Sequence, residues 1–97
     1  MFKEITPEQA KKLMKNKDIV LLDVRTPEEY AEQHLKGSLN IDINSDGFSG
    51  KLKKLDREKV YIVFCRSGAR SSAATQIMKD QGFKTVLCVI GWVFEEA

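Results

Sequence analysis

Apolar and polar residues along this chain form two kinds of pattern that alternate from one end to the other. Continuous runs of leucine and β-branched residues predict strands, because a strand buried on both faces carries apolar side chains at successive positions. Such runs, with some shorter apolar segments, place predicted strands at residues 2–5, 19–22, 38–43, 60–64 and 84–90. Strands that alternate with helix-like segments are typical of a parallel sheet covered by helices, which places the chain in the α/β class.

The first two predicted helices begin with the same local motif. Thr6 and Thr26 are each followed by a proline, and Gln9 and Glu29 stand three residues after the threonines. In this arrangement the threonine hydroxyl accepts from an amide of the first helical turn, while the Gln or Glu side chain accepts from the threonine amide. Proline suits the first helical position, so we expect one helix to start directly after each threonine.

Two further helices are predicted from the spacing of apolar side chains. Residues 51–59 are charged at most positions and carry two leucines one helical turn apart. Residues 69–81 place small and apolar side chains four positions apart and are followed by Gly82, which suits the end of a helix. Residues 44–50 are rich in Asn, Ser, Asp and Gly and predict a loop, and residues 91–97 predict a turn or a short helix.

Length and composition narrow the classes of function. The 97 residues, 42% hydrophobic and 31% charged, predict one small globular domain over residues 1–97. The net charge is only +2, which indicates neither nucleic acid nor an anionic membrane as a partner. The two cysteines fit a reducing compartment, and no apolar run reaches the roughly 18 residues of a membrane span. We therefore expect a cytoplasmic monomer.

The clearest chemical feature lies between the predicted strand 60–64 and the predicted helix 69–81. It is the sequence Cys65, Arg66, Ser67, Gly68, Ala69, Arg70 and Ser71. Backbone amides in so tight a turn converge on one point, and the following helix adds the positive end of its dipole, so the loop predicts an anion site. Gly68 supplies a residue that tolerates positive φ. Amides, helix end and arginine charges together should lower the pKa of the Cys65 thiol and make it nucleophilic.

The other reactive side chains give weaker evidence for a functional role. The one histidine, His34, lies in a different segment, so no Cys-His pair is indicated and the loop itself must activate Cys65. Cys88 stands in an apolar strand and is interpreted as a small core residue, with a resolving thiol as the alternative. Residues 42–47 copy the first half of a calcium loop, but Lys53 stands where the bidentate glutamate is needed. No metal site is predicted.

The loop resembles the active-site loop of single-domain rhodaneses, the thiosulfate sulfurtransferases. The resemblance extends to Asp23-Val24-Arg25, to Glu28-Glu29-Tyr30 and to residues 34–41, in the same order along the chain. It implies a three-layer rhodanese-like fold, with a parallel sheet of about five strands between helices, in a single rhodanese-like domain over residues 1–97. It also implies that Cys65 takes sulfur from thiosulfate or another sulfane-sulfur donor as a persulfide and passes it to cyanide, a small thiol or a protein thiol, without a cofactor.

The resemblance also suggests roles for the residues around the thiol. Arg66 and Arg70 are expected to attract the dianionic donor, and Ser67 and Ser71 to offer hydroxyl hydrogen bonds. Asp23 and Arg25 are expected at the carboxyl edge of the sheet, where ligands bind in parallel α/β folds. For these two residues, a structural ion pair or turn cap and a direct catalytic role both remain open.

Two other functions fit part of the pattern. Phosphatases and arsenate reductases of related design have five residues between the cysteine and the arginine, whereas this loop has four and carries Ser71 at the position where the longer loop has its arginine. A rhodanese-like module that only binds a partner is the other alternative. The chain also departs from the family pattern at Gln33, where a glycine commonly stands, and at Trp92, which follows Gly91 in place of a second glycine.

Overall fold

Five parallel strands form the centre of the fold, as the apolar pattern predicts. The computed structural model describes residues 1–93. Within them the strands are β1 (Phe2–Ile5), β2 (Val20–Asp23), β3 (Leu39–Asn40), β4 (Val60–Phe64) and β5 (Thr85–Val89), joined in the order β1-β5-β4-β2-β3. The helices are α1 (Pro7–Leu13), α2 (Pro27–Glu32), α3 (Phe48–Leu52) and α4 (Ala69–Asp80). The turn expected at residues 91–97 lies partly outside the described residues.

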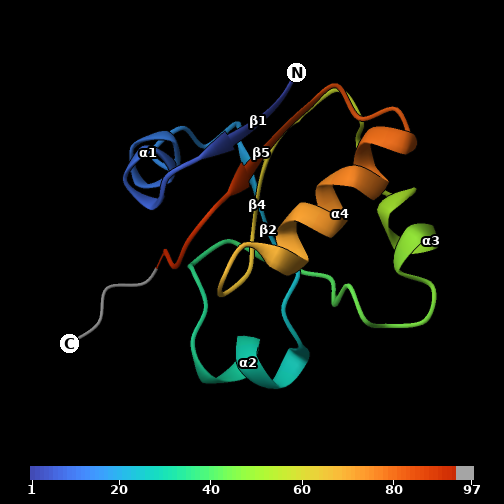
Figure 1. Cartoon of the computed structure of the whole chain (residues 1–97), viewed down its shortest axis with the longest axis horizontal. Helices are drawn as coiled ribbons and strands as arrows, with labels where there is room; N and C mark the ends of the chain where they lie inside the picture. The colour runs from blue at the N-terminus through green and yellow to red at the C-terminus, as the bar shows by residue number, and fades with distance from the viewer. Residues whose placement is uncertain (94–97) are drawn as a thin grey trace.

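The helices cover the two faces of the sheet unequally. In Figure 1, α1 lies on one side of the sheet, α3 and α4 lie on the other, and α2 lies beyond the carboxyl ends of the strands. The core under α3 and α4 contains Leu22, Val24, Phe48, Leu52, Tyr61, Val63, Cys65, Ala74, Met78, Phe83 and Val86. The core under α1 contains Ile5, Ala10, Ile62, Phe64, Leu87, Val89 and Val93. Within the described residues, no helix has the length and apolar character needed to cross a membrane.

Both predicted capping boxes are present. Thr6 Oγ1 accepts from the Gln9 amide at 3.2 Å, and Gln9 Oε1 accepts from the Thr6 amide at 2.9 Å. Thr26 and Glu29 make the same pair of contacts, at 3.2 and 3.3 Å. Each box satisfies amides that the first helical turn leaves without partners, so the local sequence alone sets where α1 and α2 begin.

Helix α4 also has the limits that its sequence predicts, with Gln81 as the capping residue. Gly82 follows with φ +89°, and the Phe83 amide donates to Met78 O at 3.1 Å. This is the glycine-terminated helix end in which a left-handed residue lets the next amide reach back to the last turn. Ser71, Ala74 and Met78 form the buried side of the helix.

Two predicted elements have the wrong limits. The strand expected at residues 38–43 is only Leu39–Asn40, because the chain then leaves the regular ladder, with the Ile43 amide bonded to Val24 O. The helix expected at residues 51–59 is instead α3, which occupies part of the predicted loop. Phe48 and Leu52, four positions apart, anchor it to the core, and a left-handed Gly47 begins it.

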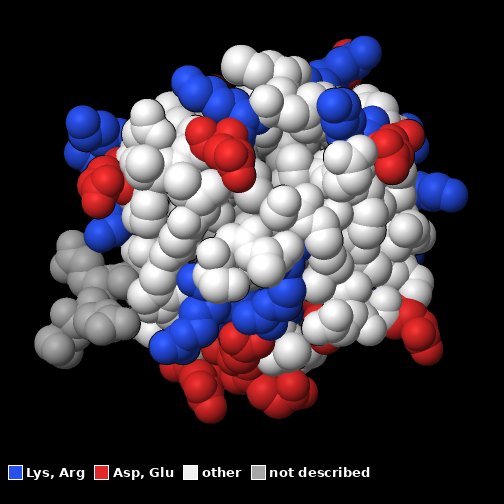
Figure 2. Space-filling view, in the orientation of Figure 1, with Lys and Arg blue, Asp and Glu red and all other residues white. Residues whose placement is uncertain are grey.

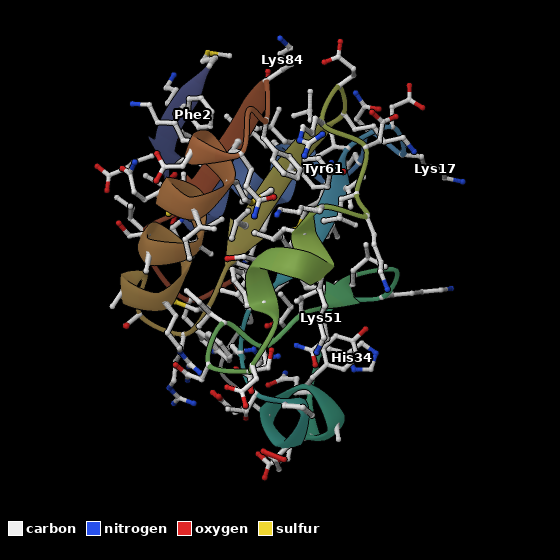
Figure 3. All side chains as sticks on the ribbon, turned by 90° about the vertical axis from the view of Figure 1, so that its right-hand side faces the viewer. Phe2, Lys17, His34, Lys51, Tyr61 and Lys84 are labelled. Atoms are coloured by element: carbon white, nitrogen blue, oxygen red, sulfur yellow. The ribbon has the colours of Figure 1, made fainter. Side chains whose placement is uncertain are left out.

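Tyr61 illustrates how the core joins the segments on the α3 and α4 side. Its ring packs edge to face against Phe83, with ring centres 5.3 Å apart, and its hydroxyl donates to Asp56 O at 2.6 Å. Figure 3 shows Tyr61 beside the strands above α3. The hydroxyl contact holds the turn between α3 and β4. The sequence pattern predicts this turn as part of a helix over residues 51–59.

We predict that Leu52→Ala lowers the free energy of unfolding by about 3 kcal/mol, because it removes a fully buried side chain and leaves a cavity under α3. Urea denaturation followed by circular dichroism measures the loss. The matched control is Lys53→Ala, the exposed next residue, for which we expect a change within about 0.5 kcal/mol. Equal losses for the two variants would contradict the role of α3 as a packed helix.

Candidate active site

The sulfur of Cys65 lies at the centre of the loop between β4 and α4. The Gly68 amide donates to Sγ at 3.0 Å and the Ser71 amide at 3.4 Å. Ser71 Oγ lies 3.6 Å from the same sulfur. Since Ser71 belongs to the first turn of α4, one of these amides is a helix N-terminal donor. The loop thus presents several donors to one buried sulfur atom, as the sequence predicts for an anion site.

These contacts change the pKa of the Cys65 thiol. Burial by itself raises the pKa of Cys65, but hydrogen bonds from the backbone and side chain of Ser71 and from the amides of Gly68 and Ser67 outweigh burial and hold that pKa below its ordinary value. A hydrogen bond to the charged form favours ionisation. The contacts therefore increase the fraction of thiolate, the reactive form of a cysteine, relative to an ordinary thiol.

Gly68 allows the loop to lie against the end of β5. Its φ is +100°, a value that side chains strongly disfavour. A β-carbon at this position would also lie 3.3 Å from Ile90 Cα and 3.5 Å from Val89 O, both backbone atoms. Conformation and close packing therefore both require glycine here.

Arg70 points to α2 and forms an ion pair with Glu29. The two guanidinium nitrogens lie 2.6 and 3.1 Å from the two Glu29 oxygens. The hydrogen bond from Arg70 lowers the pKa of Glu29 to about 2, and the same contact raises the pKa of Arg70. Figure 2 shows basic side chains directly beside acidic ones at the lower edge of the molecule. The charge of Arg70 is therefore largely compensated, and this residue joins the loop to α2.

Arg66 is exposed and packs on an aromatic ring. Its guanidinium carbon lies 5.1 Å from the centre of the Trp92 ring, and that of Arg25 lies 5.2 Å from the same ring. Both distances lie in the range of cation–π attraction. Trp92 thus restrains the exposed Arg66 at the rim of the loop. Ser67 and Ala69 are also exposed there.

Asp23 and Arg25 form a buried ion pair at the carboxyl end of β2. Arg25 Nε lies 3.0 Å from Asp23 Oδ1, and Nη2 lies 2.7 Å from Oδ2, while Nη2 also donates to Gln33 O at 2.6 Å. Asp23 is fully buried and Arg25 is only 3% exposed. These contacts connect β2 to the end of α2, so the structural interpretation of the pair has direct support.

His34 packs against Tyr30 of α2. His34 Nδ1 lies 2.8 Å from Tyr30 O, and its ring stacks on Tyr30 with ring centres 3.9 Å apart. Figure 3 shows His34 beside α2. In the part of the chain that the structure describes, no three His, Cys, Asp or Glu side chains gather in a way that could hold a metal ion.

Sequence reasoning missed three residues of this site. The capping box already explains why a glutamate stands at position 29. Its pairing with Arg70, 41 positions away, cannot be detected from the local sequence. Trp92 is visible only as a departure from the two-glycine pattern. Cys88 reads as an apolar strand residue, yet its sulfur lies 3.4 Å from Ser71 Oγ, inside the hydrogen-bond network of the loop.

We predict that Gly68→Ala slows alkylation of Cys65 by iodoacetamide at least tenfold, because a side chain pushes the loop and its amide donors away from the sulfur. Gly82→Ala is the matched control. Gly82 also has positive φ, +89°, but its nearest atom to an added β-carbon is a flexible Arg57 side-chain atom at 4.0 Å. This control should lose about 1 kcal/mol of stability and keep its Cys65 reactivity. Equal alkylation rates in the two variants would refute the packing argument.

We predict that Glu29→Gln lowers the free energy of unfolding by about 1 kcal/mol at about pH 7, because the partly exposed ion pair with Arg70 is lost. The folded-state pKa of Glu29, about 2, lies below its ordinary 4.5, so its contribution is complete above 4.5 and disappears as the pH falls through about 2. The difference between wild type and variant in urea denaturation should shrink over that window. Glu28→Gln, on the exposed side of α2, is the control; a difference that stays constant with pH would contradict the assignment.

Comparison with known proteins agrees with this geometry. Residues 6–93 match the family described as the rhodanese-like domain. Thiosulfate sulfurtransferase GlpE of Coxiella burnetii is 35% identical over 91 residues, which cover 94% of this chain and 83% of that protein. The structure of a rhodanese-related protein from Thermoplasma volcanium has a TM-score of 0.80 and 32% identity, covering 94% of this chain and 86% of the other.

A more distant structure supports the fold alone. The rhodanese-like domain protein of Staphylococcus aureus has a TM-score of 0.84 with 24% identity, and the match covers 98% of this chain and 94% of the other. The expected three-layer rhodanese-like architecture is confirmed. Since the family match spans residues 6–93 and a relative of 35% identity is covered over most of its own length, this chain belongs to the rhodanese-like domain family.

Proposed function

We propose that this sulfurtransferase carries sulfane sulfur as a persulfide on Cys65, taking it from thiosulfate or a related donor and passing it to cyanide or a thiol. The observation that carries the proposal is the position of the Cys65 sulfur, which accepts hydrogen bonds from the Gly68 and Ser71 amides within one short loop. Preorganised donors of this kind stabilise negative charge on sulfur without a metal or a separate base. The relative of 35% identity is named a thiosulfate sulfurtransferase, which supports the same chemistry.

The first half of the reaction loads the cysteine. The Cys65 thiolate attacks the sulfane sulfur of thiosulfate and forms a new S–S bond. The S–S bond of thiosulfate breaks, and sulfite leaves with the bonding electron pair. Cys65 thereby becomes a persulfide, and no external oxidant or reductant is needed. The lowered pKa of Cys65 increases the fraction of the thiolate, which is the nucleophile of this step.

The second half of the reaction releases the sulfur. Cyanide, or the thiolate of an acceptor, attacks the outer sulfur of the persulfide, and the S–S bond to Cys65 breaks. The products are thiocyanate, or an acceptor persulfide, together with the Cys65 thiolate. Because the amides of Gly68 and Ser71 already face the cysteine sulfur, they stabilise it when it leaves as an anion.

The two arginines of the loop have different tasks in this proposal. Arg66 is exposed at the rim and is the cation available to attract an anionic donor. Arg70 is paired with Glu29 and holds the loop to α2, so it acts by positioning the amides. Asp23 and Arg25 support the same edge of the sheet through their contacts with α2. No metal or cofactor takes part in the proposed steps.

We predict that incubation with thiosulfate adds the mass of one sulfur atom to the protein, and that peptide mapping finds it on Cys65. Cys65→Ala should abolish both this adduct and thiocyanate formation from cyanide, because the attacking atom is gone. The matched control is Ser72→Ala, an exposed position of α4 one residue beyond the loop, which should load as wild type does. An undiminished adduct in Cys65→Ala would refute the proposal. A wild-type protein that accepts sulfur from neither thiosulfate, polysulfide nor a cysteine persulfide would favour a binding module.

A further inference from the structure

The Ser71 hydroxyl group is shared among four buried or backbone partners. Its oxygen lies 3.0 Å from Gly68 O, 3.3 Å from Val89 O, 3.6 Å from Cys65 Sγ and 3.4 Å from Cys88 Sγ. A serine hydroxyl has one proton to donate and can accept through its lone pairs. The two carbonyl groups can only accept, whereas the two thiols can also donate. The partner that receives the Ser71 proton therefore depends on the state of the thiols.

Ionisation of Cys65 changes the preferred direction of this hydroxyl. While Cys65 is a thiol, Ser71 can donate to Gly68 O or Val89 O and accept from the thiol. Once Cys65 has lost its proton, its sulfur is a charged acceptor, and a hydrogen bond to a charged acceptor is stronger than one to a neutral carbonyl. The Ser71 hydroxyl must then turn to the sulfur, and it loses its hydrogen bond to the carbonyl oxygen.

Cys88 is placed to assist this change. It lies in β5 opposite Val63 of β4, on the same side of the sheet as Val86, which belongs to the core under α4. Cys65 directly follows β4, two positions after Val63, and belongs to the same core. Cys88 is only 4% exposed. Its S–H group can donate to Ser71 Oγ at 3.4 Å. A donor to an oxygen strengthens the hydrogen bond that the same oxygen gives, because hydrogen bonds in a chain polarise one another.

We propose that Cys88 is a positioning residue that acts through Ser71: it donates to Ser71 Oγ and directs the Ser71 proton to the Cys65 sulfur. In the thiolate state of Cys65, the proposed hydrogen bonds run from Cys88 to Ser71 and from Ser71 to Cys65, across sulfur–oxygen distances of 3.4 and 3.6 Å. No bond forms or breaks at Cys88, and the sulfur-transfer steps stay on Cys65. The inference rests on the proposed role of Cys65 as the nucleophile, and it gives the second cysteine a task in the same site.

The charged groups near the two thiols come from β1 and α4. Arg70, in the loop, interacts electrostatically with Cys65. The groove between β1 and α4 reaches Cys88 and is lined by Lys3 and Glu4 from β1 and by Lys79 from α4. Figure 3 shows Phe2, another residue of this groove, close to α4. Substitution of Cys88 leaves all these charges in place, so a changed Cys65 reactivity can be assigned to the hydrogen bond.

The experiment compares three proteins by the pH dependence of alkylation with iodoacetamide. Cys88→Val keeps the volume approximately and removes the donor, whereas Cys88→Ser keeps a donor. In both variants Cys65 is the one remaining thiol of the chain, and in the wild type its alkylation is followed on the Cys65 peptide. We expect the Cys88→Val profile to move to higher pH, with alkylation about threefold slower on its rising part, because one link of the hydrogen-bond chain is lost. Cys88→Ser should follow the wild-type profile.

Two outcomes of this comparison would overturn the proposal. One is an unchanged profile in Cys88→Val, and the other is an equal displacement in Cys88→Val and Cys88→Ser, which would indicate packing. If Cys88→Val does not fold, Cys88→Ala replaces it with the same expectations. The Ser71→Ala background gives a second test: there, adding Cys88→Val should have no further effect, and an additive effect would also overturn the proposal. Alkylation needs no sulfur donor, so these results are independent of whether Cys65 accepts sulfur.

Discussion

The close contact between Gly68 and the backbone of Ile90 is the constraint on which the candidate site depends. The loop after β4 is short, and its amides converge on the Cys65 sulfur only while the loop lies flat against the end of β5. A positive φ at Gly68 turns the chain, and the missing side chain lets two backbones meet. The arrangement of amide donors around the Cys65 sulfur therefore depends jointly on β4, β5 and α4, although all the donors belong to one segment of sequence.

A second set of interactions fixes this loop relative to α2. The Arg70–Glu29 pair and the contacts of Arg25 with Asp23 and Gln33 connect the loop, β2 and α2. Of the two arginines that the sequence suggests for donor binding, Arg70 is thus engaged in a structural ion pair with Glu29. The amides, which are held rigidly by the backbone, remain as the stabilising groups of the sulfur, and such dipoles need little reorganisation when charge develops.

The sequence predicts those parts of the protein that depend on local chemistry. Capping boxes set the starts of α1 and α2, apolar runs set β2, β4 and β5, and the loop around Cys65 is recognisable from its own residues. The limits of β3 and α3 could not be predicted in this way, because α3 depends on burial of Phe48 within a segment of loop-like composition. Glu29 and Cys88 gain their contacts in the site from tertiary packing, which brings together residues 41 and 17 positions apart.

The pairing of β1 with β5 has a consequence for the order of assembly. The first strand of the chain forms its ladder with the last described strand, Phe2 opposite Val86, so the sheet closes through contacts between distant parts of the sequence. Such non-local pairing is slow to form, because a long segment of chain must be ordered before it is stabilised. During synthesis, β1 leaves the ribosome well before β5, the strand with which it pairs. Gly68 also has no strand to pack against until β5 has been made. Until β5 is in place, the loop whose hydrogen bonds lower the pKa of Cys65 is therefore not held in its final position.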